Sequence, residues 1–180
     1  MNEELNNANY CTLDIQTSGL FETESEIIEI SIVKVRNSKI VDTFSTLIKP
    51  SKQLIVNVQK ITNISNEVLQ YAEDISTVLP RAMKFIGNDT IICHNAKFIM
   101  DFLQYNCNNL GIKLENEVID TITLADKLFS DLKNRKLSTV CERIGLTNIQ
   151  LEGTMQEVYI LVYIYEYYKN NNSVESKFKD

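Results

Sequence analysis

The 180-residue chain is 44% hydrophobic and carries a formal net charge of −6. A chain of this size can bury one sizeable core, and its acidic balance provides no field that would attract a phosphate backbone. Basic residues gather only in two short stretches, which contain Lys34, Arg36, Lys39, Lys133, Arg135 and Lys136. We interpret these stretches as solvated surface, with a small local basic groove as the alternative.

The cysteine pattern and the hydropathy predict an intracellular, single-domain protein. The four cysteines show no CxxC spacing, so we expect small core residues in a reducing compartment and neither a zinc site nor a disulfide framework; they are Cys11, Cys93, Cys107 and Cys141. The polar start of the chain lacks the apolar segment of a signal peptide, and no apolar run approaches the roughly 20 residues of a membrane span. We therefore expect a cytoplasmic protein with one domain over residues 1–170 and a polar tail over residues 171–180.

The first half of the chain is rich in β-branched residues and then turns helical. Three antiparallel strands are expected at Tyr10–Thr17, Glu26–Val35 and Ile40–Ile48, with a hairpin connection at Arg36–Lys39. Apolar residues at helical spacing then predict two helices, Asn66–Tyr71 and Ile75–Ile86, which Ser65 and Asp74 are placed to cap.

The second half alternates strand and helix. Strands are expected at Thr90–Cys93 and Val118–Ile119, and helices at Ala96–Leu110, at Thr121–Leu132, at Leu137–Ile144 and from about Thr154 onward. A strand, a helix and a further strand imply a parallel crossover. The whole order predicts an α/β domain with a mixed five-stranded sheet flanked by helices.

Six short motifs follow one another along the chain. They are Asp14–Leu20, Glu26–Ile30, Ile61–Ile64, His94–Phe98, Val118–Thr121 and Lys136–Thr139. In this order and at these spacings, the set resembles the DnaQ-like DEDDh group of 3′-5′ exonucleases, the proofreading family of the DNA polymerase III epsilon type. The resemblance covers about residues 9–168, and it implies a ribonuclease-H-like fold and hydrolysis of phosphodiester bonds.

The resemblance also implies a catalytic site, and this chain departs from it. In the family, four carboxylates hold two divalent metals about 3.5–4 Å apart, and a histidine acts as general base. Carried over position by position, the catalytic residues fall on Asp14, Gln16, Ile99, Glu152 and Glu157. Only Asp14 keeps the family residue, while Glu157 is a homologous acid, so these two are the candidate metal ligands. We predict a degenerate active site.

Two of the departures remove metal ligands. The Asp-x-Glu motif places both acids on one face of a strand, and Gln16 keeps the shape of glutamate without its charge. Ile99 replaces a carboxylate with a hydrocarbon, although Mg²⁺ and Mn²⁺ prefer anionic oxygen ligands. Asp101 lies two residues further on, about 200° around a helix, and is not expected to face the same site.

The third departure removes the base. Counting without a gap from Ile144–Leu146 places the family histidine on Glu152 and the family aspartate on Glu157. A glutamate with a reference pKa of about 4.3 is a weak base at neutral pH, whereas imidazole titrates near about 6.5.

Other motif residues match the pocket that binds the 3′-terminal nucleotide in the family. These nucleotide-binding candidates are Thr17, Ser18, Gly19, Leu20, His94, Asn95 and Phe98. The alternative is that they persist because they build the fold. For His94 we favour a structural role at the end of a strand, and for Asp120 an N-cap rather than a metal ligand.

We predict a catalytically inactive or impaired exonuclease-fold protein that binds a protein partner or a nucleic-acid 3′ end. The alternatives are an active exonuclease with a rebuilt site, or a structural dimer or adaptor. We expect no resident cofactor, with Mg²⁺ or Mn²⁺ required only where activity remains. The last helix offers a protein interface because aromatic residues crowd it, although core packing explains one side of it; its tyrosines are Tyr159, Tyr163, Tyr165, Tyr167 and Tyr168.

Overall fold

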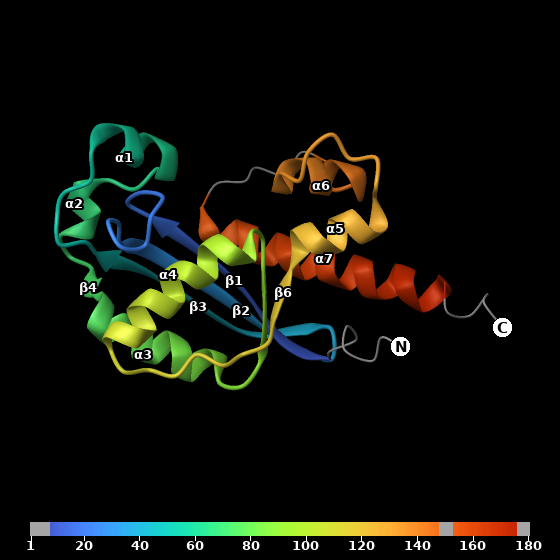
Figure 1. The fold of residues 1–180 in the computed structure, drawn as a ribbon, viewed down its shortest axis with the longest axis horizontal. Helices are drawn as coiled ribbons and strands as arrows, with labels where there is room; N and C mark the ends of the chain where they lie inside the picture. Colours follow the sequence, from blue (N-terminus) through green and yellow to red (C-terminus); the bar gives the residue numbers. More distant parts are fainter. Residues whose placement is uncertain (1–7, 148–152, 176–180) are drawn as a thin grey trace.

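The computed structural model describes residues 8–147 and 153–175, and it places six strands in one mixed sheet (Figure 1). The strand order is β4-β3-β2-β1-β5-β6, and the strands are β1 (Asn9–Thr17), β2 (Ile27–Arg36), β3 (Lys39–Lys49), β4 (Glu73–Asp74), β5 (Thr90–Cys93) and β6 (Val118–Asp120). β1, β2 and β3 pair antiparallel, whereas β5 and β6 continue the sheet in parallel from β1. The α/β class with a mixed sheet is confirmed.

The expected count of five strands is wrong by one strand. The additional strand, β4, has only two residues and pairs in parallel with the end of β3. Two residues are too few to produce an alternating pattern in the sequence. The hairpin between β2 and β3 is confirmed. Asn37 and Ser38 both have positive φ, 50° and 59°, as the two central residues of a type I′ turn require.

Helices cover both faces of the sheet. They are α1 (Val56–Thr62), α2 (Asn66–Leu69), α3 (Ile75–Ile86), α4 (Ala96–Asn109), α5 (Thr121–Leu128), α6 (Leu137–Arg143) and α7 (Thr154–Glu175). On one face, α3 and α4 pack against Leu13 and Ile32. On the other face, α5 and α7 pack against Tyr10 and Val33, and α6 packs on α7. α1 and α2 cover the place where β2 begins and β3 ends.

One helix was not expected, and two helices end at other residues than expected. α1 was not expected, because most of its apolar residues are exposed and leave no helical stripe. The helix beginning at Thr121 ends at Leu128 and does not reach Leu132. α7 continues to Glu175, past residue 170 where the polar tail was expected to begin, because neither proline nor glycine interrupts the sequence there. Among the described residues, no helix is both long and apolar enough to cross a membrane.

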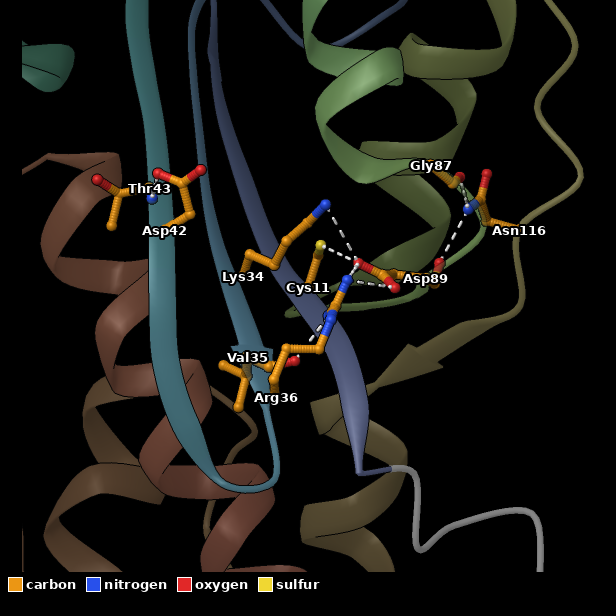
Figure 2. A network of polar contacts seen from close by, with 9 residues as sticks. All are labelled: Cys11, Lys34, Val35, Arg36, Asp42, Thr43, Gly87, Asp89 and Asn116. Atoms are coloured by element: carbon orange, nitrogen blue, oxygen red, sulfur yellow. Dashed lines mark hydrogen bonds and ion pairs between the residues drawn. The ribbon is translucent and has the colours of Figure 1, made fainter.

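A polar network fastens the start of β5 to β1 and β2 (Figure 2). Both carboxylate oxygens of Asp89 accept hydrogen bonds from Arg36, at 2.9 and 2.7 Å, and Lys34 Nζ lies 3.6 Å from Oδ2. The Cys11 thiol donates to the same carboxylate at 3.2 Å. Burial, and then this hydrogen bond, raise the pKa of the thiol to about 12, so it stays a neutral donor. All four cysteines are buried and free, as expected.

We predict that Asp89→Asn destabilises the domain by about 1–3 kcal/mol, because Lys34 and Arg36 lose their shared counter-charge in a partly buried setting. The Asp89 side chain is only 13% exposed. Thermal unfolding followed by circular dichroism measures the loss. Asp101→Asn is the matched control, since its pair with Lys97 is exposed and is expected to contribute less than about 1 kcal/mol. Equal effects of the two variants would contradict a structural role for the Asp89 network.

Candidate active site

Asp14 lies beneath the first turns of α7. Alternate side chains of β1 face this helix: Tyr10 belongs to the cluster that α7 covers, and the Thr12 hydroxyl donates to the Val158 carbonyl at 2.8 Å. By the period of two, Asp14 and Gln16 point to the same side of the sheet. The structure therefore brings Asp14 near Glu157, which lies in the first turn of α7.

Three carboxyl groups interact at this point. Burial raises the pKa of Asp14 well above its usual range, and the charges of Glu157 and Glu29 raise it further. Burial also raises the pKa of Glu157, again with a contribution from Glu29. Like charges in a poorly solvated place favour protonation. The acidic cluster of Asp14, Glu29 and Glu157 therefore retains protons above the pH at which exposed carboxyls lose theirs.

Glu29 was not among the expected site residues. It lies on β2 directly opposite Gln16 in the β1–β2 register. Burial raises its pKa, while hydrogen bonds from the hydroxyl and the backbone amide of Thr154 oppose this shift. Thr154 begins α7, so Glu29 satisfies a donor of the first helical turn. The sequence signal for Glu29 was a single acid in the apolar first part of β2, and this signal became informative only once the strand register was known.

A chain of hydroxyl groups supports the same helix start. Ser31 Oγ lies 2.6 Å from Thr154 Oγ1 and 2.8 Å from Ser45 Oγ, and both Ser31 and Thr154 are fully buried. Buried hydroxyls need such partners, and the chain fixes the position of α7 relative to β2. The placement of Glu157 over Asp14 is therefore defined by the packing of the helix.

Ile99, the expected position of a metal ligand, belongs to the hydrophobic core. It is 2% exposed, lies in the first turns of α4 and joins the same cluster as Ile15 and Leu103. Asp101 instead pairs with Lys97 at 2.6 Å on the exposed side of α4, as the helical spacing predicts. Glu152 lies outside the described residues.

The described residues do not fit the two-metal site that the resemblance implies. One ligand position is a hydrocarbon in the core, and a second is the neutral Gln16. Within residues 8–147 and 153–175, no group of three or more His, Cys, Asp and Glu side chains is arranged to hold a metal ion. The assignment of Asp14 and Glu157 as residual metal ligands stays a prediction.

His94 holds two loops together. Its Nε2 lies 2.8 Å from the Arg135 carbonyl and its Nδ1 lies 2.8 Å from Thr121 Oγ1. Because a carbonyl can only accept, Nε2 carries the proton and Nδ1 accepts from the hydroxyl. Burial lowers the pKa of His94, which favours this neutral form. The contacts support the structural interpretation of His94.

Asp120 is the N-cap of α5, as predicted. One carboxylate oxygen accepts from the Ile122 amide at 2.9 Å. The carboxylate also accepts from the amides of Asn95 and Ala96, at 3.1 and 2.8 Å. Asn95 has a positive φ of 63° at the start of α4, so Asp120 stabilises an unusual backbone conformation there. The Asp120 side chain is thus hydrogen-bonded to the backbone of Asn95.

The segment after β1 combines an internally bonded turn with exposed apolar side chains. Thr17 Oγ1 donates to the Gly19 carbonyl at 2.6 Å, and Ser18 Oγ accepts from the Glu26 amide at 2.8 Å. A side chain at Gly19 would collide with Ser25, which explains the glycine. Leu20 follows and is 75% exposed. Phe98 is half-buried and packs on Phe102 with ring centroids 5.0 Å apart.

Three residues of the basic stretches are engaged in contacts within the domain. Lys34 and Arg36 are engaged by Asp89 near the opposite end of β1, where Asn9 pairs with Arg36. Arg135 pairs with Asp126 and donates to the Leu132 carbonyl. These three residues therefore stabilise the fold through ion pairs and hydrogen bonds, and they are more buried than the solvated surface that the sequence predicted.

The tyrosines of α7 divide between the core and the surface. Tyr165 and Tyr168 are buried, and Tyr165 packs edge-on against Tyr10 at 4.7 Å between ring centroids. Tyr159 and Tyr163 are exposed, to 37% and 61%. Core packing therefore explains part of the aromatic content, and an interface or a homodimer through this helix stays a prediction.

The mixed sheet with helices on both faces defines the class of the protein, an α/β domain, and comparison with known proteins adds its family. Residues 12–151 match the Exonuclease (RNase_T) family. A DNA polymerase III PolC-type protein of Clostridium perfringens is 36% identical over 145 residues, covering 81% of this chain and 10% of the relative. A second protein of that description, from Caldanaerobacter subterraneus, is 39% identical over 133 residues, covering 74% of this chain and 10% of the relative. The chain spans about a tenth of the length of these relatives.

Solved structures show the same fold. Exonuclease X in complex with 5′ overhanging duplex DNA superposes with a TM-score of 0.75 at 21% identity, covering 91% of this chain and 93% of that one. The nuclease domain of 3′hExo, a DEDDh family member bound to rAMP, gives a TM-score of 0.75 at 17% identity, covering 91% and 92%. The chain belongs to the exonuclease family, with a DnaQ-like, ribonuclease-H-like fold.

Proposed function

We propose that this domain binds nucleic-acid 3′ ends and hydrolyses them slowly or not at all. The observation that carries the proposal is the position of Ile99 in the hydrophobic core, 2% exposed, where the family places a metal-binding carboxylate. Two-metal hydrolysis needs anionic oxygen ligands on both ions, and neither Ile99 nor Gln16 supplies one.

The upward shift in pKa of the acidic cluster supports binding without metals. A phosphate approaching ionised Asp14, Glu29 and Glu157 would be repelled, and the raised pKa values of these groups lessen that repulsion. A neutral carboxyl can donate a hydrogen bond to a phosphate oxygen. Two related structures contain nucleic acid or a nucleotide, Exonuclease X with DNA and 3′hExo with rAMP.

Exposed apolar side chains near the motif residues support contact with bases. Leu20 and Phe21 are 75% and 63% exposed on the segment that leaves β1. Stacking of a base on an aromatic side chain such as Phe21 contributes about 1–3 kcal/mol and tolerates any sequence, and Leu20 adds apolar contact beside it. Because the chain is acidic and Asp89 already pairs with Lys34 and Arg36, we expect modest affinity with a shallow dependence on salt.

The decisive experiment combines a nuclease assay with a binding assay. We expect no degradation of 5′-labelled single-stranded DNA or RNA by the pure protein with Mg²⁺ or Mn²⁺, beyond a matched EDTA control. Fluorescence anisotropy should show binding of the same oligonucleotides with a 3′-hydroxyl, weakened about tenfold by the double substitution Leu20→Ala and Phe21→Ala. Ile40→Ala, on the distant β2–β3 hairpin, is the control variant for binding.

One observation favours an active enzyme with a rebuilt site as the second candidate. Glu29 lies opposite Gln16 and places a third acid beside Asp14 and Glu157. This candidate predicts metal-dependent, EDTA-sensitive degradation that Asp14→Asn abolishes and Asp101→Asn leaves intact. That result would replace the binding proposal.

A further inference from the structure

The loop that joins α5 to α6 lies beside the end of β5. The Arg135 carbonyl in this loop accepts from His94 Nε2 at 2.8 Å, and His94 directly follows the last residue of β5. β5 runs parallel to β1, so both strands end at the same edge of the sheet. Burial raises the pKa of Cys93, at the end of β5, and the nearby charges of Asp120 and Asp14 add to the shift. The loop therefore borders the acidic cluster.

α6 follows the loop and reaches the same cluster. It packs beside α5 and α7, where Leu137 belongs to the group of apolar residues that contains Ile160 (Figure 1). Burial raises the pKa of Cys141 on α6 to about 11, with a contribution from the charge of Glu157. The loop and α6 together thus lie next to both Asp14 and Glu157.

Side-chain contacts fix the shape of the loop. Asn134 Oδ1 accepts from the Lys136 amide and from the Thr139 hydroxyl, both at 2.9 Å. The Arg135 guanidinium pairs with Asp126 on α5, while the carbonyl of the same residue is held by the histidine. The loop therefore has its shape without a ligand, so binding to it costs little conformational entropy.

Two lysines of the loop carry unpaired charge. Lys133 and Lys136 are exposed, and neither has an ion-pair partner among the residues that the structure describes. The one acid of the loop, Asp131, pairs with Arg143 at 3.0 Å. Residues 120–143 hold five lysine and arginine side chains against four aspartate and glutamate side chains, although the whole chain carries a net charge of −6. The loop is therefore a basic site at the border of an acidic one.

We propose that Lys133 and Lys136 bind phosphates of a nucleic-acid strand upstream of its 3′-terminal nucleotide. This inference rests on the proposed function, which places the 3′ end of the strand at the acidic cluster. The phosphate of the terminal nucleotide then faces carboxyl groups, whereas the preceding phosphates reach the two lysines. Lysine binds phosphate as a point charge, so these contacts tolerate any base sequence. They add affinity only for strands that extend beyond the terminal nucleotide.

The salt dependence of binding tests the two contacts. The probe is a deca-thymidine single strand with a 5′ label and a 3′-hydroxyl, followed by fluorescence anisotropy between about 50 and 200 mM NaCl. Counterion release from two phosphates gives a slope of about −1.4 when log affinity is plotted against log salt concentration. Lys133→Gln and Lys136→Gln together should bring this slope close to zero and weaken binding about tenfold at the lowest salt concentration.

Lys39→Gln and Lys84→Gln together are the matched control. They remove the same charge from exposed positions on the β2–β3 hairpin and on α3, which covers the opposite face of the sheet from α6. This control should keep the slope of the parent. All four lysines are exposed, so both double variants should unfold at the temperature of the parent by circular dichroism. Thymidine 5′-monophosphate, which has no upstream phosphate, should bind both variants as it binds the parent.

Three results would overturn the inference: an unchanged slope in the Lys133→Gln and Lys136→Gln variant, an equal loss of slope in the control, or equal weakening of the mononucleotide. Where the slope alone stays unchanged and Leu20→Ala with Phe21→Ala still weakens the oligonucleotide, the proposed function stands without this contact. No binding of deca-thymidine to the parent would overturn both. Hexaglutamate that binds as tightly as the oligonucleotide would assign the lysines to an acidic protein instead.

Discussion

Asp14→Asn is expected to stabilise the domain at pH 8 and to leave its stability nearly unchanged near pH 4. Burial and the neighbouring charges raise the folded-state pKa of Asp14. The unfolded state, with a pKa of about 3.9, therefore loses its proton first as the pH rises. The folded state binds more protons in that window, so the free energy of unfolding falls from about pH 4 up to the folded pKa. Asparagine removes this loss and keeps an acceptor oxygen.

The expected gain at pH 8 is about 1–2 kcal/mol, which corresponds to about 2–8 °C in the melting temperature of a domain of this size. Differential scanning calorimetry of both proteins at several pH values measures it. Asp101→Asn serves as the matched control because Asp101 lies in an exposed pair. A variant that is less stable than the parent at pH 8 would mean that the ionised carboxylate of Asp14 is held by favourable contacts.

The sequence predicted the fold well where a pattern extends over many residues. The three long strands, the hairpin at Asn37 and Ser38, and the cap at Asp120 all followed from alternation, turn chemistry and helix-start rules. The elements that the sequence did not predict are short or bury little apolar surface. β4 has two residues, and α1 buries too little apolar surface to show a helical stripe.

Only part of the acidic cluster could be predicted from the sequence, because its geometry depends on strand register and helix placement. Asp14 and Glu157 are far apart in sequence, and the motif spacing was sufficient to bring them together. Glu29 was not predicted because Gln16, the residue opposite it, is on another strand, and Thr154, which donates hydrogen bonds to it, lies far along the chain. His94 is the opposite case. Histidine is a residue type suited to catalysis, but here both ring nitrogens are hydrogen-bonded to other residues of the domain.

Ile99→Asp alone is expected to destabilise the domain by about 3–5 kcal/mol, because it places an unpaired carboxyl in the hydrophobic core. Ile99 is 2% exposed and shares its cluster with Ile15 and Leu103. Ile99→Val, which removes one methyl group, is the matched control and should cost about 0.5–1.5 kcal/mol. Chemical denaturation in urea measures both values. An effect of Ile99→Asp as small as that of Ile99→Val would mean that the position opens readily to solvent.

The same position tests whether the scaffold still accepts metals. Combining Ile99→Asp with Gln16→Glu, Glu152→His and Glu157→Asp restores every residue that the family resemblance requires. If the backbone has kept its geometry, Mn²⁺ should stabilise this quadruple variant by about 2.7 kcal/mol at a concentration 100 times the dissociation constant, and should leave the parent unchanged. Bound Mn²⁺ would also offset part of the cost of burying the carboxyl that Ile99→Asp introduces. An equal Mn²⁺ shift in the parent would show that Asp14, Glu29 and Glu157 already bind a cation, whereas no shift in either protein would show that the backbone has moved away from the metal-binding geometry along with the side chains.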